Sequence, residues 1–182
     1  MTTAGPVLIL DDDPDVLKAA RLAIAPDAAH VETLGSPSGL EAALAERPYE
    51  AVLVDMNFVL GDHSGREGLD ALDRIQAADP TLAVVLMTAY GGVSLAVDAL
   101  KRGACDFVLK PWRNDKLAAA VRAAAVLTRA RREAERSFNL DRVERRAIER
   151  AMARYDGNVS QAAAALGLTR PALYRRLVKH GL

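Results

Sequence analysis

The sequence has few of the features that define several common protein classes. Among its 182 residues there is one cysteine, Cys105, which excludes an internal disulfide framework and a zinc site built on cysteines. Its apolar runs stop short of the roughly 18 residues that a membrane span needs. The N-terminal segment has no basic region, and its apolar run ends at aspartates, unlike a secretory signal peptide. These absences predict a cytoplasmic protein that does not contact membranes.

The chain also has no net charge, because 24 basic residues face 24 acidic ones. This balance hides two parts of opposite sign. Residues 1–127 contain 11 Lys or Arg and 18 Asp or Glu, a net charge of −7. Residues 128–182 contain 13 basic and 6 acidic residues, a net charge of +7. Such an asymmetry indicates an acidic module joined to a basic module that binds nucleic acid.

Short apolar runs alternate with helical patterns in the acidic part of the chain. Continuously apolar strands between helices favour βαβ units and a parallel sheet that is covered on both faces. We therefore predict an α/β fold with a doubly wound five-stranded parallel sheet, whose ligand crevice lies at the carboxyl ends of the strands. The expected strands are residues 7–10, 30–34, 51–54, 82–87 and 107–109. The expected helices between them are residues 15–25, 38–46, 69–76 and 94–102.

From Asn114 onward the pattern is alanine-rich and helical, and residues 115–137 contain neither glycine nor proline. The simplest interpretation is a helix that leaves the first domain as a semi-rigid connector. We expect a first domain over residues 1–127, a helical linker over 128–138 and a small all-α domain over 139–182.

Five polar residues directly follow the ends of predicted strands. The carboxyl ends of parallel strands meet at one edge of a sheet, so we expect these side chains to share a crevice. Crowded carboxylates repel one another, and a hard divalent cation such as Mg²⁺ relieves that repulsion. A metal ion beside a lysine and a hydroxyl also suits phosphoryl transfer to a carboxylate nucleophile. The five residues are Asp11, Asp12, Asp55, Thr88 and Lys110.

Four motifs in this region resemble the receiver domain of two-component response regulators. They read VLILDDDPDV at residues 7–16, VLVD at 52–55, MTAY at 87–90 and FVLKPW at 107–112. They occur in the order found in that family, and the likeness covers about residues 5–127. The resemblance implies a phosphorylated protein whose partner is a cognate sensor histidine kinase.

The same resemblance assigns roles to individual residues. It implies that Asp55 is the phosphoacceptor and that Mg²⁺ is the cofactor. The metal ligands would be Asp11, Asp12, Asp55 and the backbone carbonyl of Asn57. The switch and phosphoryl-binding residues would be Thr88, Phe107 and Lys110. As in that family, the Lys110–Pro111 bond is expected to be cis.

The segment after Asp55 departs from the family's pattern. Receivers commonly have a turn that contains Met-Pro, whereas residues 56–68 form a longer segment without proline. This departure leaves the role of Asp55 intact and leaves the geometry of the loop and the lifetime of the phosphoryl group open. His63 in this segment is predicted to be a solvated loop residue.

A second interpretation is a Mg²⁺-dependent phosphatase of the haloacid-dehalogenase type, because Asp11 and Asp13 have its Asp-x-Asp spacing. That family has Thr or Val two residues after the second aspartate, where this chain has Asp15. The phosphatase interpretation also leaves Asp55 without a role. Asp13 and Asp15 are more simply explained as residues at the start of a helix.

The basic domain contains three helical patterns. Asn158 is expected to cap the second, at residues 159–166, and Thr169 the third, with Pro171 in its first turn. Gly167 between them favours a helix-turn-helix, whose second helix enters the major groove of DNA. Because arginine pairs with guanine there, we expect Arg170 and Arg175 to contact bases, and Arg176, Lys179 and His180 to contact phosphates. The predicted DNA-binding residues are Thr169, Arg170, Tyr174, Arg175, Arg176 and Lys179.

The string GNVSQAAAALGLTRPALYRRL at residues 157–177 resembles the Fis-type helix-turn-helix that closes enhancer-binding regulators. This resemblance implies a homodimer that binds double-stranded DNA, with the helix over 141–154 in the dimer interface. The apolar stripe of that helix, formed by Leu140, Val143, Ala147 and Ala151, is alternatively wholly core of its own domain. No GxxxxGK[ST] loop of a central ATPase occurs in the sequence.

We therefore expect a transcriptional regulator, not an enzyme, in which phosphorylation of Asp55 controls DNA binding. One alternative remains besides the phosphatase: a phosphorelay or adaptor protein that does not bind DNA. Steep salt dependence of DNA binding would distinguish the regulator from this adaptor.

Overall fold

The computed structural model describes residues 4–58, 65–89, 93–137 and 140–182. The chain divides into two compact units, Met1–Arg132 and Glu133–Leu182, which we name the first unit and the second unit. Across the described ranges, no helix combines the length and the apolar character that crossing a membrane requires.

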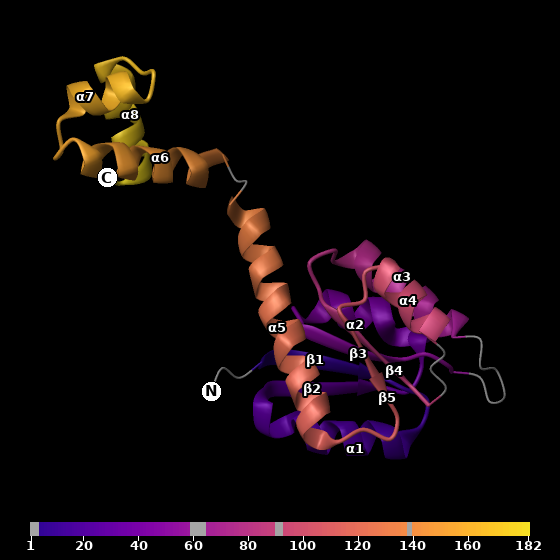
Figure 1. Ribbon diagram of the computed structural model, residues 1–182. Coiled ribbons are helices and arrows are strands. Elements are labelled where there is room, and N and C mark those ends of the chain that lie inside the picture. The colour runs from indigo at the N-terminus through magenta and orange to yellow at the C-terminus, as the bar shows by residue number, and fades with distance from the viewer. Residues whose placement is uncertain (1–3, 59–64, 90–92, 138–139) are drawn as a thin grey trace. The chain divides into compact units, whose positions relative to one another are not determined.

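A five-stranded parallel sheet forms the centre of the first unit, in the order β2-β1-β3-β4-β5 (Figure 1). β1 pairs with β2 on one side and with β3 on the other, so the strand order reverses at β1. The ligand crevice of such a sheet lies beside this point, at the carboxyl ends of the strands. The predicted α/β fold is confirmed. The strands are β1 (Ala4–Leu10), β2 (Ala28–Leu34), β3 (Ala51–Asp55), β4 (Val84–Thr88) and β5 (Asp106–Leu109).

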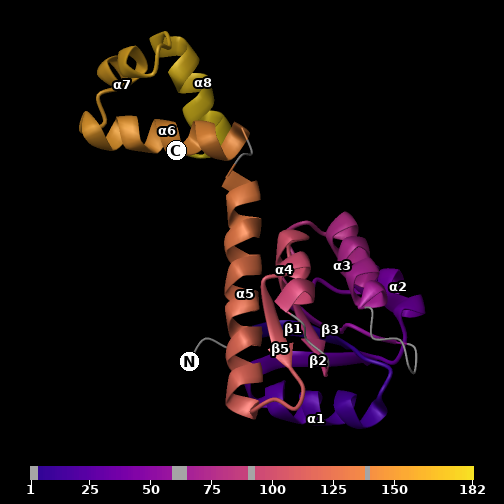
Figure 2. The ribbon, with the colours of Figure 1, turned by 45° about the vertical axis from the view of Figure 1, so that its right-hand side comes forward.

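Helices cover both faces of this sheet (Figure 2). Successive side chains of a strand point to opposite faces. Leu8 and Leu10 of β1 therefore join the core under α2, α3 and α4, whereas Val7 and Ile9 join the core under α1 and α5. The helices are α1 (Pro14–Ile24), α2 (Leu40–Glu46), α3 (Arg66–Ala78), α4 (Val93–Lys101) and α5 (Asn114–Ser137), with 3₁₀ turns η1 (Ala25–Asp27) and η2 (Pro37–Gly39).

The start of α1 places the first carboxylates of the crevice. Asp13 caps this helix, because its Oδ1 accepts hydrogen bonds from the N–H groups of Asp15 at 2.8 Å and Val16 at 3.4 Å. The helix thus begins immediately beyond Asp11 and Asp12, which stay at the end of β1. The predicted role of Asp13 at the start of a helix is confirmed. Because its side chain caps α1, it does not serve as the second aspartate of the Asp-x-Asp pair in the phosphatase interpretation.

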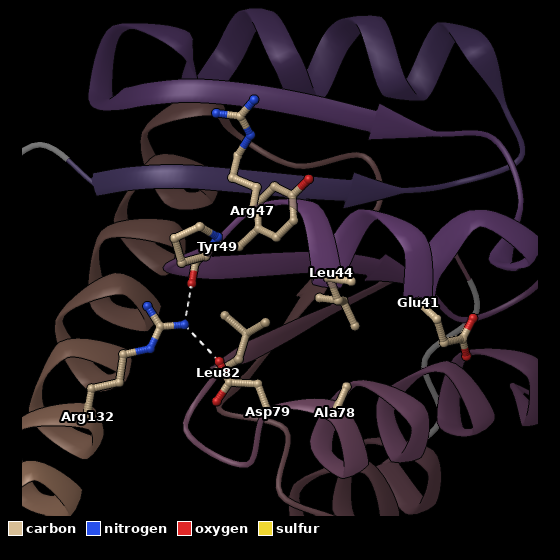
Figure 3. Close-up of a pocket in the computed structure, with 10 residues that line it drawn as sticks. Glu41, Leu44, Arg47, Tyr49, Ala78, Asp79, Leu82 and Arg132 are labelled. Carbon is tan, nitrogen blue, oxygen red and sulfur yellow. Dashed lines mark hydrogen bonds and ion pairs between the residues drawn. The ribbon is translucent and has the colours of Figure 1, made fainter.

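The C-terminal part of α5 forms hydrogen bonds to residues at the amino ends of the strands. The hydroxyl of Thr128 accepts a hydrogen bond from the N–H of Ala83 at 2.9 Å, and both groups are buried. Arg132 donates to the Tyr49 carbonyl and to the Asp79 carboxylate, each at 2.8 Å (Figure 3). These contacts border a cavity of about 470 Å³. The cavity lies at the amino edge of the sheet, opposite to the crevice at the carboxyl ends.

Three helices form the second unit around a small apolar core. The side chain of Asn158 accepts hydrogen bonds from two N–H groups at the start of the second helix, and that of Thr169 accepts one at the start of the third. Gly167 between them has φ of 67°, a left-handed conformation that glycine adopts without strain. The predicted caps and helix-turn-helix are confirmed. The helices are α6 (Leu140–Arg154), α7 (Val159–Ala165) and α8 (Arg170–His180), and the core residues are Ile148, Ala151, Ala162, Ala163, Leu173 and Leu177.

The apolar stripe of α6 is only partly core. Ala151 near the end of the helix is buried, but Leu140 is 83% exposed and Val143 is 47% exposed. The interpretation that this stripe is wholly core of its own domain is therefore wrong. Its first half is an exposed apolar surface.

Candidate functional site: the acidic crevice and the face of α8

Three carboxylates meet at the carboxyl ends of β1 and β3. Oxygen atoms of Asp11, Asp12 and Asp55 all lie within 4.8 Å of one another. The side chain of Asp11 is 1% exposed and that of Asp55 is 8% exposed, whereas Asp12 is exposed. Crowding and burial both disfavour the charged form of a carboxylate, so this cluster requires positive charge nearby.

One lysine supplies part of that charge. The Nζ of Lys110 lies 2.6 Å from Oδ2 of Asp11 and 2.7 Å from Oδ1 of Asp55. Burial works against the ammonium, but the hydrogen bonds to the two carboxylates outweigh it and raise the pKa of Lys110. Lys110 reaches this point because its N–H donates to the carbonyl of Thr88 at 2.7 Å, beside β4. The Lys110–Pro111 bond is cis, as predicted.

One ammonium does not balance three carboxylates. Burial raises the pKa of Asp11, and the neighbouring charge of Asp55 adds to this, while the bonds to Lys110 oppose it. Carboxylate oxygens around a partly solvated opening are the ligands that Mg²⁺ prefers, with water in its remaining positions. The donor set of this crevice therefore fits one divalent cation.

The predicted switch residues lie on β4, which is beside β3, and on β5, which follows β4 at the edge of the sheet. Thr88 is the last residue of β4 and is buried. Phe107 of β5 is opposite Leu86 of β4 in register and packs, partly buried, against the core under α4. The fold thus brings Asp11, Asp12, Asp55 and Lys110 together in one crevice. Thr88 lies at the carboxyl end of β4, and Phe107 lies on the neighbouring strand β5.

Sequence reasoning selected Asn57 only for its backbone carbonyl, and it missed Glu67 and Gly68, which also shape the wall of the crevice after Asp55. The amide oxygen of Asn57 accepts a hydrogen bond from the N–H of Gly65 at 2.9 Å, and Glu67 accepts one from the N–H of Phe58 at 2.6 Å. A Cβ atom on Gly68 would lie 2.7 Å from the carbonyl oxygen of Asp55, so α3 approaches the end of β3 too closely for any larger residue. The Gly-rich stretch after Asp55 was the available signal. His63 lies outside the described residues.

The second unit presents a different kind of surface on α8. Arg170 stacks over the ring of Tyr174, with its guanidinium carbon 5.7 Å from the ring centroid. Arg175 is exposed, and within the described ranges it has no hydrogen bond or ion pair. Val178, which sequence reasoning did not select, is 81% exposed on the same side of the helix.

The remaining cations of α8 contact α6. Arg176 donates to Glu144 at 2.5 Å, and Lys179 donates to Asp141 at 2.5 Å. His180 lies 2.9 Å from the other carboxylate oxygen of Glu144. Hydrogen bonds from His180 and Arg176 lower the pKa of Glu144 to about 2. Of the six predicted DNA-binding residues, Arg176 and Lys179 are thus paired within the unit, although Lys179 remains exposed. The other four are exposed.

Comparisons with known proteins agree with both units. A family described as response regulator receiver domain matches residues 7–122, and one described as bacterial regulatory protein, Fis family, matches residues 139–180. The chain is 30% identical over 174 residues to the photosynthetic apparatus regulatory protein RegA of Rhodovulum sulfidophilum, covering 95% of this chain and 91% of that protein. It is 31% identical to the acid tolerance regulatory protein ActR of Sinorhizobium medicae, covering 95% and 86%.

Other relatives are longer than this chain. A putative response regulator described as NtrX-like, from Rickettsia bellii, is 31% identical over 127 residues, and the match spans 70% of this chain but only about a quarter of that protein. Among solved structures, the receiver domain of a two-component response regulator from Bacteroides fragilis is 42% identical, with a TM-score of 0.61. The match covers 68% of this chain and 98% of that domain.

Proposed function

This chain belongs to the response regulators, and we propose that it is a DNA-binding transcriptional regulator whose activity depends on phosphorylation of Asp55. The observation that carries the proposal is that one chain contains both an acidic crevice and a helix-turn-helix. The first unit gathers Asp11, Asp12, Asp55 and Lys110 in one crevice. The second unit presents the helix-turn-helix with exposed arginines.

The phosphoryl donor in this proposal is a phosphohistidine of a sensor kinase. A carboxylate oxygen of Asp55 attacks the phosphorus, the P–N bond breaks, and the freed imidazole nitrogen takes up a proton. Lys110, already 2.7 Å from Asp55, holds an oxygen of the transferred group. Asp11, Asp12, Asp55 and the backbone carbonyl of Asn57 would hold Mg²⁺, which when bound neutralises charge on the phosphoryl group. The chain turns over no substrate in this scheme and is not an enzyme.

The phosphoryl group adds roughly −1.5 to −2 charges to a crevice that is already acidic. Thr88 moves its hydroxyl toward the new oxygens, and Phe107 repacks on the neighbouring strand. This change biases an existing equilibrium between two arrangements of the α4–β5 surface. The active species is a homodimer, to which the exposed apolar residues Leu140 and Val143 of α6 contribute.

Double-stranded DNA is the partner of the second unit. In a helix-turn-helix the N-terminal residues of the second helix reach base edges. Thr169 and Arg170 lie there, Tyr174 and Arg175 lie one turn further along α8, and all four are exposed. Lys179 meets a phosphate, because its ion pair with Asp141 is exposed and exchanges easily with solvent.

A labelling experiment tests this proposal. The purified protein is incubated with Mg²⁺ and a radiolabelled small-molecule phosphodonor, beside Asp55→Asn as the matched variant. We expect acid-stable, base-labile label on the wild type and none on Asp55→Asn, together with tighter DNA binding by the labelled wild type. Label that persists on Asp55→Asn would remove the central claim. Labelling without any salt-dependent DNA binding would favour an adaptor instead.

A further inference from the structure

The surface of α8 is divided into a side that faces solvent and a side that faces α6. Tyr174, Arg175 and Val178 lie on the solvent side and are exposed. Arg176, the immediate neighbour of Arg175, lies on the other side, and its side chain is 34% exposed. Two adjacent arginines of the same helix therefore have different surroundings.

Glu144 of α6 is the centre of the contacts on the second side. One of its oxygens accepts from Nε of Arg176 at 2.5 Å, and the other lies 2.9 Å from Nε2 of His180 and 3.3 Å from Nζ of Lys179. The side chain of His180 is only 7% exposed. Arg176 also donates to the carbonyl of Ala172, one turn earlier, at 3.2 Å. Nε of Arg176 and the ring of His180 thus join α8 to α6, while Nη1 of Arg176 bonds within α8.

The bond to Glu144 holds the guanidinium of Arg176 against α6, and turning it to the solvent side of α8 would break that bond. Charge-assisted hydrogen bonds such as that between Arg176 and Glu144 are among the stronger contacts that a side chain makes. Lys179 differs, since its half-exposed ammonium can turn from one anion to another without loss of packing.

We propose that Glu144 is a positioning residue for DNA recognition: it holds Arg176 and His180, fixes the orientation of α8 on α6, and keeps Arg176 off the DNA. The side of α8 formed by Tyr174, Arg175 and Val178 is then the one that enters the major groove. Arg175 reads a guanine, and the apolar surface of Tyr174 and Val178 lies against thymine methyl groups. This inference rests on the proposed function, because it assigns roles within the same DNA-binding surface.

The experiment uses the full chain and two probes of equal length: a duplex selected by the wild type from a random pool, and a random-sequence duplex. Affinity for each is measured over a range of salt concentrations. The variants are Glu144→Gln, Arg176→Gln and their double mutant. Lys179→Gln serves as the control for a phosphate contact, and Arg175→Gln as the control for a base contact. Circular dichroism confirms at the working temperature that each variant is folded.

We expect Lys179→Gln to lower the log–log salt slope by about 0.9 per protomer. Arg175→Gln should lower affinity for the selected duplex by about tenfold to a hundredfold. Glu144→Gln and Arg176→Gln should leave the slope unchanged and reduce the preference for the selected duplex by about tenfold, the equivalent of one base contact. The double mutant should match either single mutant, because both act through one ion pair.

Two results would overturn the inference. One is a salt slope that falls for Arg176→Gln as it does for Lys179→Gln, which would make Arg176 a phosphate contact. The other is a Glu144→Gln variant that binds both duplexes more tightly in equal proportion, which would make Glu144 only a competing anion. If Arg176→Gln does not fold, Glu144→Gln alone decides between these readings. A wild type that binds neither duplex would instead remove the proposed function.

Discussion

In the first unit three carboxylates face a single lysine, whereas in the second unit Arg176, Lys179 and His180 of α8 face Glu144 and Asp141 of α6. The acidic crevice is left with negative charge that its own residues do not balance. The basic unit neutralises part of its charge internally. The net charges of −7 for residues 1–127 and +7 for residues 128–182 therefore describe composition. The charge that a site offers to a ligand depends on which of its side chains are already paired.

The difference follows from how the two sites are built. Asp11, Asp55 and Lys110 come from three strand ends and are almost buried, so their charges interact strongly and water screens them little. The pair of Lys179 with Asp141 on α8 and α6 is exposed, and an exposed ion pair contributes little to stability. We expect the same kind of substitution to have a large effect in the crevice and a small one at α8.

Lys110→Met gives the largest expected effect. It keeps the apolar stem of the side chain and leaves two buried carboxylates without their cation, a change that costs about 3 kcal/mol of unfolding free energy. The measurement is urea unfolding in Mg²⁺-free buffer, followed by the fluorescence of the chain's one tryptophan, Trp112, which packs against the core of the first unit.

Lys179→Met is the matched control in the second unit. Its ion pairs are exposed, and we expect no measurable loss in the far-UV circular dichroism transition. Equal losses for the two lysine variants would show that the crevice and α8 hold their charges in the same way.

Mg²⁺ gives the next effect. A cation that binds only the folded crevice stabilises it by about 2.7 kcal/mol when its concentration is one hundred times the dissociation constant. Urea unfolding followed by Trp112 fluorescence at increasing Mg²⁺ concentration should show this stabilisation in the wild type. The stabilisation should be much smaller in Asp12→Asn. NaCl at matched ionic strength is the control. Amide hydrogen exchange of α6 to α8 should not respond, and a response there would place a cation site in the second unit.

The smallest effect is a pH dependence centred on Glu144. Its pKa is lowered from 4.5 to about 2 by His180 and Arg176, so the folded state releases this proton more readily than the unfolded state. The resulting stability is present above about pH 4.5 and is lost as the pH falls toward 2. Amide exchange of α8 in wild type and Glu144→Gln should therefore differ at neutral pH and converge in acid. A constant difference down to pH 2 would contradict the low pKa.

The order of the elements and most of the crevice could be predicted from the sequence. Buried strands have continuous apolar runs, and the polar residues that follow them, such as Asp55 and Lys110, must meet at one edge of a parallel sheet. Caps such as Asp13 and Thr169 were predictable because they depend on a few neighbouring residues.

Contacts between distant segments could not be predicted in this way. The expected helix over 38–46 begins as the 3₁₀ turn η2, because Ser36 caps a segment that contains Pro37 and Gly39. Neither the hydrogen bond from the N–H of Phe58 to Glu67 nor the close approach of Gly68 to Asp55 has a periodic signal. The pairing of Arg176 with Glu144 joins residues 32 positions apart, and the adjacent Arg175 looks the same in the sequence.

The hydrogen bonds of α5 at the amino ends of the strands determine where this chain can be truncated to give a stable first unit. Residues 128–132 lie beyond the last residue of the family match to the receiver, yet Thr128 satisfies the buried amide of Ala83, and Arg132 bridges Tyr49 and Asp79. A fragment that ended at residue 127 would leave that amide without its acceptor, at a cost of about 1–3 kcal/mol. A fragment that ends after Arg132 keeps these bonds and is the natural receiver for work on the isolated crevice.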